Sequence, residues 1–314
     1  MVFMHNIFLL YALFASVFTI SKTALEYSQP LFLIGSRMTL AGLILIAYQM
    51  IVNKERFIYD RLTWSRVFQL GFLNIYLTNV LEFWGLRYLT SFKTCFIYSL
   101  SPFLSAFFCY MLFKETMSKK KWLGLLVGFS GFAPILLSHT PNEEMGGHLM
   151  YFSWAELAVA AATVCSVYGW ILLKRLVNDH ELSPLSANGC SMLIGGVIAL
   201  AHSLYSEEWN PVPVSNYSIY LECTIALIII SNLICYNLYG YLLKRYSAPF
   251  ISFAGLTTSI FAAFFGWIFL GEAVTWPFFV SFPIVCLGLL IFDQDELKEG
   301  YLKAQGPKEQ VIEA

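Results

Sequence analysis

Two ionisable side chains, Arg37 and Glu82, lie inside long apolar runs of the chain. A charged group within a segment of membrane length is costly, and it usually marks a pathway for a substrate or a proton. At about 1.5 Å of rise per residue, helices over 30–52 and 67–86 would place the two side chains at similar depths. Two interpretations stay open: an ion pair that only joins two helices, or a Glu82 carboxylate that binds a cationic group or a proton.

Polar side chains extend this pattern along the same helix and along one in the second half of the chain. Asn79 lies three residues before Glu82 and therefore on the same helical face. An alignment of the two halves sets Glu82 opposite Asn237, and the segment around Asn237 also carries Asn232 and Tyr236. Two facing polar stripes predict a wet central cavity, whereas hydrogen bonding between helices is the alternative role.

Aromatic residues make up 17% of the chain, and some of them are expected to line the same cavity. A carboxylate among aromatic rings suits a planar or cationic solute, through stacking and cation–π contact. The predicted substrate-binding residues are Arg37, Asn79, Glu82, Trp84, Tyr98, Asn232, Tyr236 and Asn237.

The chain lacks the residue patterns of an enzyme or a metal site. Its five histidines are scattered, and its seven cysteines lie in apolar runs without a C-x-x-C pair. There is no phosphate-binding loop and no G-x-S-x-G elbow. We therefore predict no catalytic residues, no metal ligands and no cofactor, with a membrane-embedded enzyme as the least favoured alternative.

Composition predicts an all-α membrane protein. Hydrophobic residues are 58% of the chain and charged residues 12%, whereas a soluble domain carries about 25% charged residues. Each apolar run is long enough for a helix to cross about 30 Å of hydrocarbon. The net charge of −1 offers no broad basic face for nucleic acid, so the expected partners are a small-molecule substrate and the lipid bilayer. The runs are 3–21, 30–52, 67–86, 94–113, 122–138, 157–173, 185–205, 223–243, 246–271 and 273–292, which predicts about ten transmembrane helices.

The distribution of Lys and Arg predicts the orientation in the membrane. If the N-terminus is cytoplasmic, fifteen of the nineteen Lys and Arg residues lie in inside segments and three in outside segments. Positive residues favour the cytoplasmic side. Both termini are therefore expected in the cytoplasm, with 293–314 as a cytoplasmic tail and the inner membrane as the location.

An internal duplication organises the chain. The segments 30–47 and 184–201 share seven identities in eighteen positions at an offset of 154, where about two are expected by chance. The predicted repeats are 7–138 and 153–292, each with five helices. Because five is odd, the second repeat enters the membrane from the opposite side. Inverted repeats with a site between them are typical of secondary transporters that work by alternating access.

Several short motifs carry a family resemblance. They are Lys22, Arg37, the run Leu86-Arg87-Tyr88-Leu89-Thr90-Ser91, Ser101-Pro102, Phe113-Lys114-Glu115 and Leu270-Gly271-Glu272. With these motifs the chain resembles the drug/metabolite transporter superfamily, specifically its EamA-type ten-helix members, and the resemblance covers almost the whole chain. It implies transport of a small organic solute without nucleotide hydrolysis.

Within that superfamily, the chain as a whole is similar to the S-adenosylmethionine transporters of intracellular bacteria. This similarity implies uptake of S-adenosylmethionine in exchange for S-adenosylhomocysteine. A proton-coupled exporter of amino acids or drug-like cations is the alternative in the same fold. A stripe of small residues, Gly124, Gly128 and Gly131, predicts close helix packing, with a homodimer contact as its alternative use.

Overall fold

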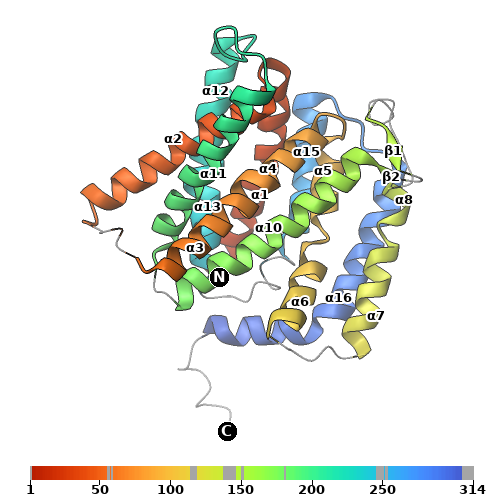
Figure 1. Ribbon diagram of the computed structural model, residues 1–314. Coiled ribbons are helices and arrows are strands. Elements are labelled where there is room, and N and C mark those ends of the chain that lie inside the picture. Colours follow the sequence, from red (N-terminus) through yellow and green to blue (C-terminus); the bar gives the residue numbers. More distant parts are fainter. Residues whose placement is uncertain are drawn as a thin grey trace.

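The computed structural model describes residues 2–54, 57, 59–113, 119–136, 146–149, 152–179, 182–244, 251 and 254–305. Within these residues the chain is almost entirely helical (Figure 1). The exception is a short antiparallel hairpin, in which β1 (His148–Leu149) pairs with β2 (Phe152–Ser153). The predicted all-α class is confirmed, and the hairpin lies between the two repeats.

In the part that the structure describes, the first repeat contains five helical segments. Two are single helices, α1 (Val2–Tyr27) and α2 (Pro30–Ile51), and Pro30 begins α2 where its missing N–H is not needed. The third segment is continuous but changes its winding, and the last two are broken. These segments are α3 (Arg61–Leu70), η1 (Gly71–Leu77) and α4 (Thr78–Leu86); α5 (Ser91–Tyr98) and α6 (Ser101–Phe113); α7 (Lys119–Ser130) and α8 (Ala133–Leu136).

The second repeat has the same order of segments. Pro184 begins α11 just as Pro30 begins α2, and the preceding Ser183 caps the helix by accepting from the N–H of Ser186. The last helix continues through Gln305, so the beginning of the predicted tail is helical. The segments are α10 (Trp154–Asp179), α11 (Pro184–Ser206), the continuous α12 (Tyr217–Leu227), η2 (Ile228–Cys235) and α13 (Tyr236–Leu243), α15 (Thr257–Leu270) and α16 (Trp276–Gln305).

Helices α2 and α11 lie side by side, and their contacts are reciprocal (Figure 1). A Cβ on Gly42 would lie 2.6 Å from the backbone N of Leu193, and one on Gly196 would lie 2.5 Å from that of Thr39. The offset of 154 between the repeats relates Gly42 to Gly196 and Thr39 to Leu193, so the two contacts are equivalent. Contacts that advance along α2 retreat along α11, so the helices are antiparallel. Such reciprocity requires a two-fold axis between the repeats. The equivalent pairs Gly35–Leu200 and Gly189–Ile46 follow the same relation.

The buried core is the interface between the repeats. One cluster packs Leu10 of α1 against Leu176 of α10, and another packs Ile34 of α2 against residues of α11 and η2. A third gathers Phe96 and its neighbours around α15 and α16. Each cluster contains side chains from both repeats, so neither repeat buries its apolar surface alone.

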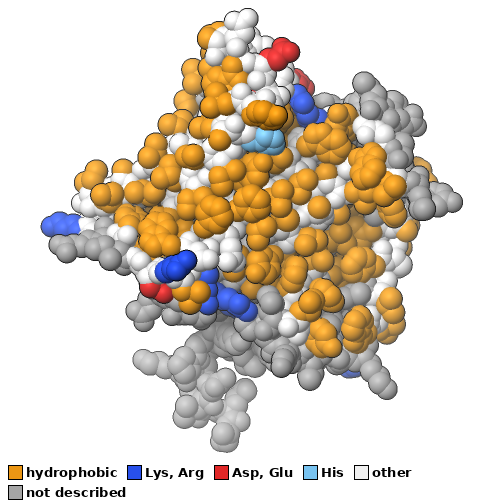
Figure 2. Space-filling view, in the orientation of Figure 1, with side chains coloured by type: hydrophobic (Ala, Val, Ile, Leu, Met, Phe, Trp, Pro, Cys, Tyr) orange, Lys and Arg blue, Asp and Glu red, His pale blue; other side chains and the backbone are white. Residues whose placement is uncertain are grey.

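The outer surface is apolar, as lipid contact requires. Figure 2 shows hydrophobic side chains spread across one face, with charged side chains at its margins. Exposed positions include Leu43, Phe264 and Trp267. In the described part of the chain, five helical segments are long and apolar enough to cross a membrane: 7–27, 30–51, 154–178, 184–206 and 217–243.

The glycine stripe of α7 packs inside the chain. A Cβ on Gly128 would lie 2.1 Å from the ring of Phe103, and one on Gly131 would lie 2.8 Å from the backbone N of Val285. A Cβ on Gly288 of α16 would lie 2.3 Å from Gly128 itself. The stripe therefore allows α7 and α16 to approach closely, which is the packing role predicted for it.

Candidate functional site

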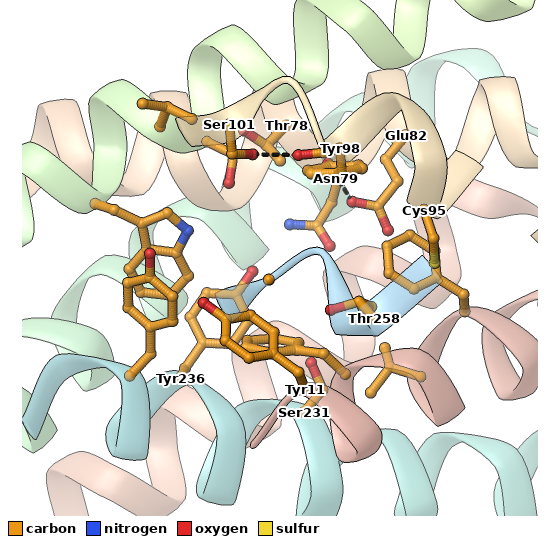
Figure 3. A pocket seen from close by; sticks show the side chains of 18 of the residues that line it. Tyr11, Thr78, Asn79, Glu82, Cys95, Tyr98, Ser101, Ser231, Tyr236 and Thr258 are labelled. Carbon is orange, nitrogen blue, oxygen red and sulfur yellow. Dashed lines mark hydrogen bonds between the residues drawn. The ribbon is translucent and has the colours of Figure 1, made fainter. Parts of the chain in front are cut away.

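A cavity lies between the two repeats, and both contribute to its walls (Figure 3). Its volume is about 130 Å³, counted as space open to the centre of a water molecule. The first repeat supplies walls from α1, α2, α4, α5 and α6. The second supplies them from α10, η2, α13 and the start of α15. The polar and aromatic lining includes Phe14, Phe18, Arg37, Asn79, Glu82, Tyr98, Ser101, Trp170, Ser231, Tyr236 and Tyr239.

Glu82 presents a carboxylate to this cavity from the middle of α4. The hydroxyl of Tyr98, at the end of α5, donates to its Oε2 at 2.6 Å (Figure 3). The other carboxylate oxygen has no hydrogen-bond partner among the described residues. One oxygen is therefore held in place, and the other is available to a ligand.

Arg37 lies on the same wall but does not pair with Glu82. Its Nη2 donates to Oδ1 of Asn79 at 2.6 Å, and its guanidinium carbon lies 4.7 Å from the centre of the Phe83 ring. The ion pairs among the described residues join other side chains, so the structure does not contain the Arg37–Glu82 ion pair that was one of the two open interpretations. The side-chain amide of Asn79, and not the carboxylate of Glu82, accepts the hydrogen bond from Arg37.

Aromatic rings form the opposite wall. Trp170 of α10 stacks on Tyr239 of α13, with ring centres 4.1 Å apart, and also lies against Tyr236 at 5.2 Å. Phe14 of α1 meets both tyrosines edge-on. The cavity therefore has a charged side from the first repeat and an aromatic side mainly from the second.

Three of the eight predicted site residues lie outside this cavity. The amide of Asn237 donates to the carbonyl of Leu233 at 2.9 Å and accepts from Asn188 of α11 at 3.0 Å. Asn232 is fully buried and donates to the sulfur of a methionine in α2. Trp84 is 36% exposed and packs on Tyr88. The two asparagines join helices, which is the alternative role considered for polar stripes.

Two π-helical segments bear on the placement of the asparagines. The N–H of Thr78, which follows η1, bonds to the carbonyl of Leu73, five residues back. In the other repeat, the N–H of Tyr236 bonds in the same way to Ser231. Each wide turn shifts the helical phase, so spacing rules that assume 3.6 residues per turn misplace the residues around it. Asn232 lies within η2, and Asn237 follows it. Such turns often occur at functional sites, and no residue pattern in the chain marked them.

The break between α5 and α6 adds hydroxyl groups to the cavity wall. Ser101 begins α6, and its hydroxyl donates to the carbonyl of Tyr98 at 2.6 Å. Ser99, inside the break, lies 3.1 Å from the hydroxyl of Ser259 in the second repeat. The break therefore ends α5 at Tyr98, which holds the carboxylate of Glu82.

Two ion pairs join the repeats beyond one end of the cavity. Lys22 of α1 lies 2.8 Å from Glu272, which also accepts from the backbone N–H of Ser91. Lys93 of α5 lies 2.7 Å from Glu156 of α10, and both side chains are fully buried. Sequence reasoning missed the second pair because both residues lie just outside the apolar runs.

An inverted pair of helical repeats around a central polar cavity is the architecture of a secondary transporter. The EamA-like transporter family matches residues 4–137 and 153–292, and the chain belongs to this family. The predicted resemblance is thereby confirmed, as is the prediction of a membrane transporter rather than an enzyme.

Individual relatives of the chain are also described as transporters. The chain is 39% identical to the S-adenosylmethionine/S-adenosylhomocysteine transporter of Chlamydia muridarum, over 94% of this chain and 93% of that protein. It is 40% identical to the protein of the same description from Chlamydia trachomatis serovar L2, over 94% and 90%. A crystal structure at 15% identity has the same fold, with a TM-score of 0.64 over 94% of this chain and 96% of that one.

Proposed function

We propose that this protein exchanges S-adenosylmethionine for S-adenosylhomocysteine across the inner membrane by alternating access, with both termini in the cytoplasm. The observation that carries the proposal is the cavity between the repeats, with the Glu82 carboxylate on one side and the stacked Trp170 and Tyr239 on the other. Support also comes from the two chlamydial transporters of this description, which are 39% and 40% identical to the chain.

The two substrates share the groups that such a cavity suits. Each carries an adenine ring, which can stack on the aromatic side, and an α-ammonium group, which a carboxylate attracts. A stacked ring pair contributes about 0.5–1.5 kcal/mol beyond the burial of its area. S-adenosylmethionine adds a sulfonium cation, which is attracted both to Glu82 and to electron-rich ring faces. One site can therefore hold either partner of the exchange.

The symmetry of the fold supports alternating access. Two inverted repeats can open the cavity to one side or to the other through two related packings. If only the loaded carrier reorients, one substrate leaves for each that enters, and no ion gradient is consumed. The cavity then needs groups that bind both substrates but no site for a coupling ion.

Purified protein in liposomes tests the proposal. Vesicles loaded with S-adenosylhomocysteine should take up labelled S-adenosylmethionine, and empty vesicles should take up very little. A pH gradient should not change the rate. Uptake that needs an inward or outward proton gradient, and not a loaded counter-substrate, would favour the proton-coupled exporter instead.

Glu82→Gln separates the two functions further. Truncating one partner of a buried charge pair costs about 2 kcal/mol or more, so the exchanger should bind its substrate roughly 30-fold more weakly and still exchange it. A proton-coupled exporter should lose all response to a pH gradient. Glu222→Gln is the matched control, because Glu222 is an exposed carboxylate on α12 outside the cavity lining, and it should leave both binding and exchange unchanged.

A further inference from the structure

Arg37 is a buried cation, and some of its hydrogen-bond donors have no partner among the described residues. Its side chain is 2% exposed and lies at the wall of the cavity. Nη2 donates to Asn79, whereas Nε and Nη1 have no hydrogen-bond partner among the described residues. A guanidinium removed from water normally has an anionic partner, because burial of an uncompensated charge is strongly unfavourable. The described residues provide no carboxylate within 4.0 Å of it.

The neighbours of Arg37 orient the guanidinium without neutralising it. Asn79 accepts from it at 2.6 Å and is itself held by a bond from its own amide to the carbonyl of Ile75 at 2.7 Å. The Phe83 ring lies 4.7 Å from the guanidinium carbon. Both neighbours are uncharged. A preoriented guanidinium with free N–H groups is the side chain best suited to bind a carboxylate.

The cavity offers a second charge of opposite sign. Glu82 has one oxygen held by Tyr98 at 2.6 Å and the other without a partner among the described residues. Because the two side chains do not pair with each other, the cavity presents a separate cation and a separate anion. A lone cation would be repelled by Arg37, and a lone anion by Glu82. A zwitterion satisfies both.

We infer that Arg37 is the receptor for the α-carboxylate of the substrate, with Glu82 facing its α-ammonium group. The site thus recognises a free α-amino acid head, and the aromatic wall is left for the nucleoside. This assignment rests on the proposed function and deepens it. It makes Arg37 a binding residue that selects for the carboxylate, not only a structural charge.

The test compares two ligands that differ by one carboxylate. S-adenosylhomocysteine and its decarboxylated analogue, 5′-deoxy-5′-(3-aminopropylthio)adenosine, compete with labelled S-adenosylmethionine for the purified protein in detergent. The wild-type protein should bind the carboxylate form about 30-fold or more tightly. This comparison needs no variant, so it does not depend on whether a substitution allows folding.

Variants then separate recognition from stability. Arg37→Gln should remove most of the preference, by weakening S-adenosylhomocysteine and leaving the analogue within about threefold. Arg37→Lys should retain part of the preference, because it keeps the charge and loses the fork of donors. Arg87→Gln is the control, since Arg87 is an exposed arginine on the loop after α4. It should leave both affinities unchanged.

The outcomes are distinguishable. Wild-type protein that binds both ligands equally, or an Arg37→Gln variant that loses both by the same factor, overturns the role of Arg37 and leaves the proposed function standing. Failure of the wild-type protein to bind any of these nucleosides overturns the proposed function, and the assignment of Arg37 falls with it.

Discussion

Breaking the buried ion pair between Lys93 and Glu156 should strongly destabilise the protein. Its Nζ and Oε1 atoms are 2.7 Å apart, and the two side chains are only 3% and 2% exposed. It joins α5 of the first repeat to α10 of the second. Removing one partner of a buried pair costs about 3–5 kcal/mol, because the other charge stays in a medium of low polarity.

Glu156→Gln is the sharpest perturbation, because it removes the charge and keeps the shape. Oε2 of Glu156 accepts from the N–H of Ser153 at 2.8 Å, and the hydroxyl of Ser153 accepts from the N–H of Glu156 at 3.1 Å. Glutamine can complete the same capping box, so the start of α10 survives. We expect a loss of about 3 kcal/mol, at the low end of the range, because Lys93 has other interactions as well.

A double-mutant cycle measures the effect. Glu156→Gln, Lys93→Met and the double variant are unfolded reversibly in mixed micelles by increasing fractions of denaturing detergent. The double variant should be more stable than the sum of the single losses predicts, by at least about 1 kcal/mol. Strictly additive losses would show that the two charges do not stabilise each other, and the reasoning would be refuted.

Further predictions concern helix contact and the cavity. Gly196→Ala should cost about 1–3 kcal/mol in the same unfolding assay, since its Cβ meets backbone at 2.5 Å. Gly189→Ala should cost less, because its Cβ meets Leu45 Cβ at 3.0 Å and no backbone atom closer than 3.5 Å. Tyr98→Phe removes a hydrogen bond to the cavity carboxylate and should weaken substrate binding about tenfold by calorimetry, with unchanged binding as the contrary result. Trp170→Leu should weaken binding about tenfold, whereas Trp84→Leu, outside the cavity, should change it less than about twofold; equal losses would contradict this.

The features visible in the sequence were those that depend on composition and on the duplication. A charged residue inside an apolar run can be recognised without knowledge of the fold. The two residues recognised in this way, Arg37 and Glu82, both line the cavity. Asn79, Tyr98 and Tyr236 line it as well. Their roles as ligands of the substrate stay predictions. The inverted order of the repeats followed from an odd number of helices, and the α2–α11 contacts agree with it.

The features that could not be predicted depend on local winding or on contacts between distant segments. The alignment of the two halves set Asn237 opposite Glu82 and so in the cavity, but in the structure Asn237 follows the wide turn of η2 and bonds to Asn188 of α11. Trp84 was predicted to line the cavity, but an aromatic side chain is equally suited to the outer surface, where the structure places it. Lys93 and Glu156 lie in short stretches between apolar runs, where a charge is ordinary, and only the packing of α5 on α10 buries them together.

The reciprocal contact between α2 and α11 means that this face of a repeat is self-complementary. Each repeat contributes the same pair of glycines to this contact, at 35 and 42 in α2 and at 189 and 196 in α11. In a homodimer of single repeats every substitution would act twice, whereas in this chain it acts once. The two repeats can therefore differ beside the contact, as at Thr39 and Leu193, but both need glycine where the backbones touch.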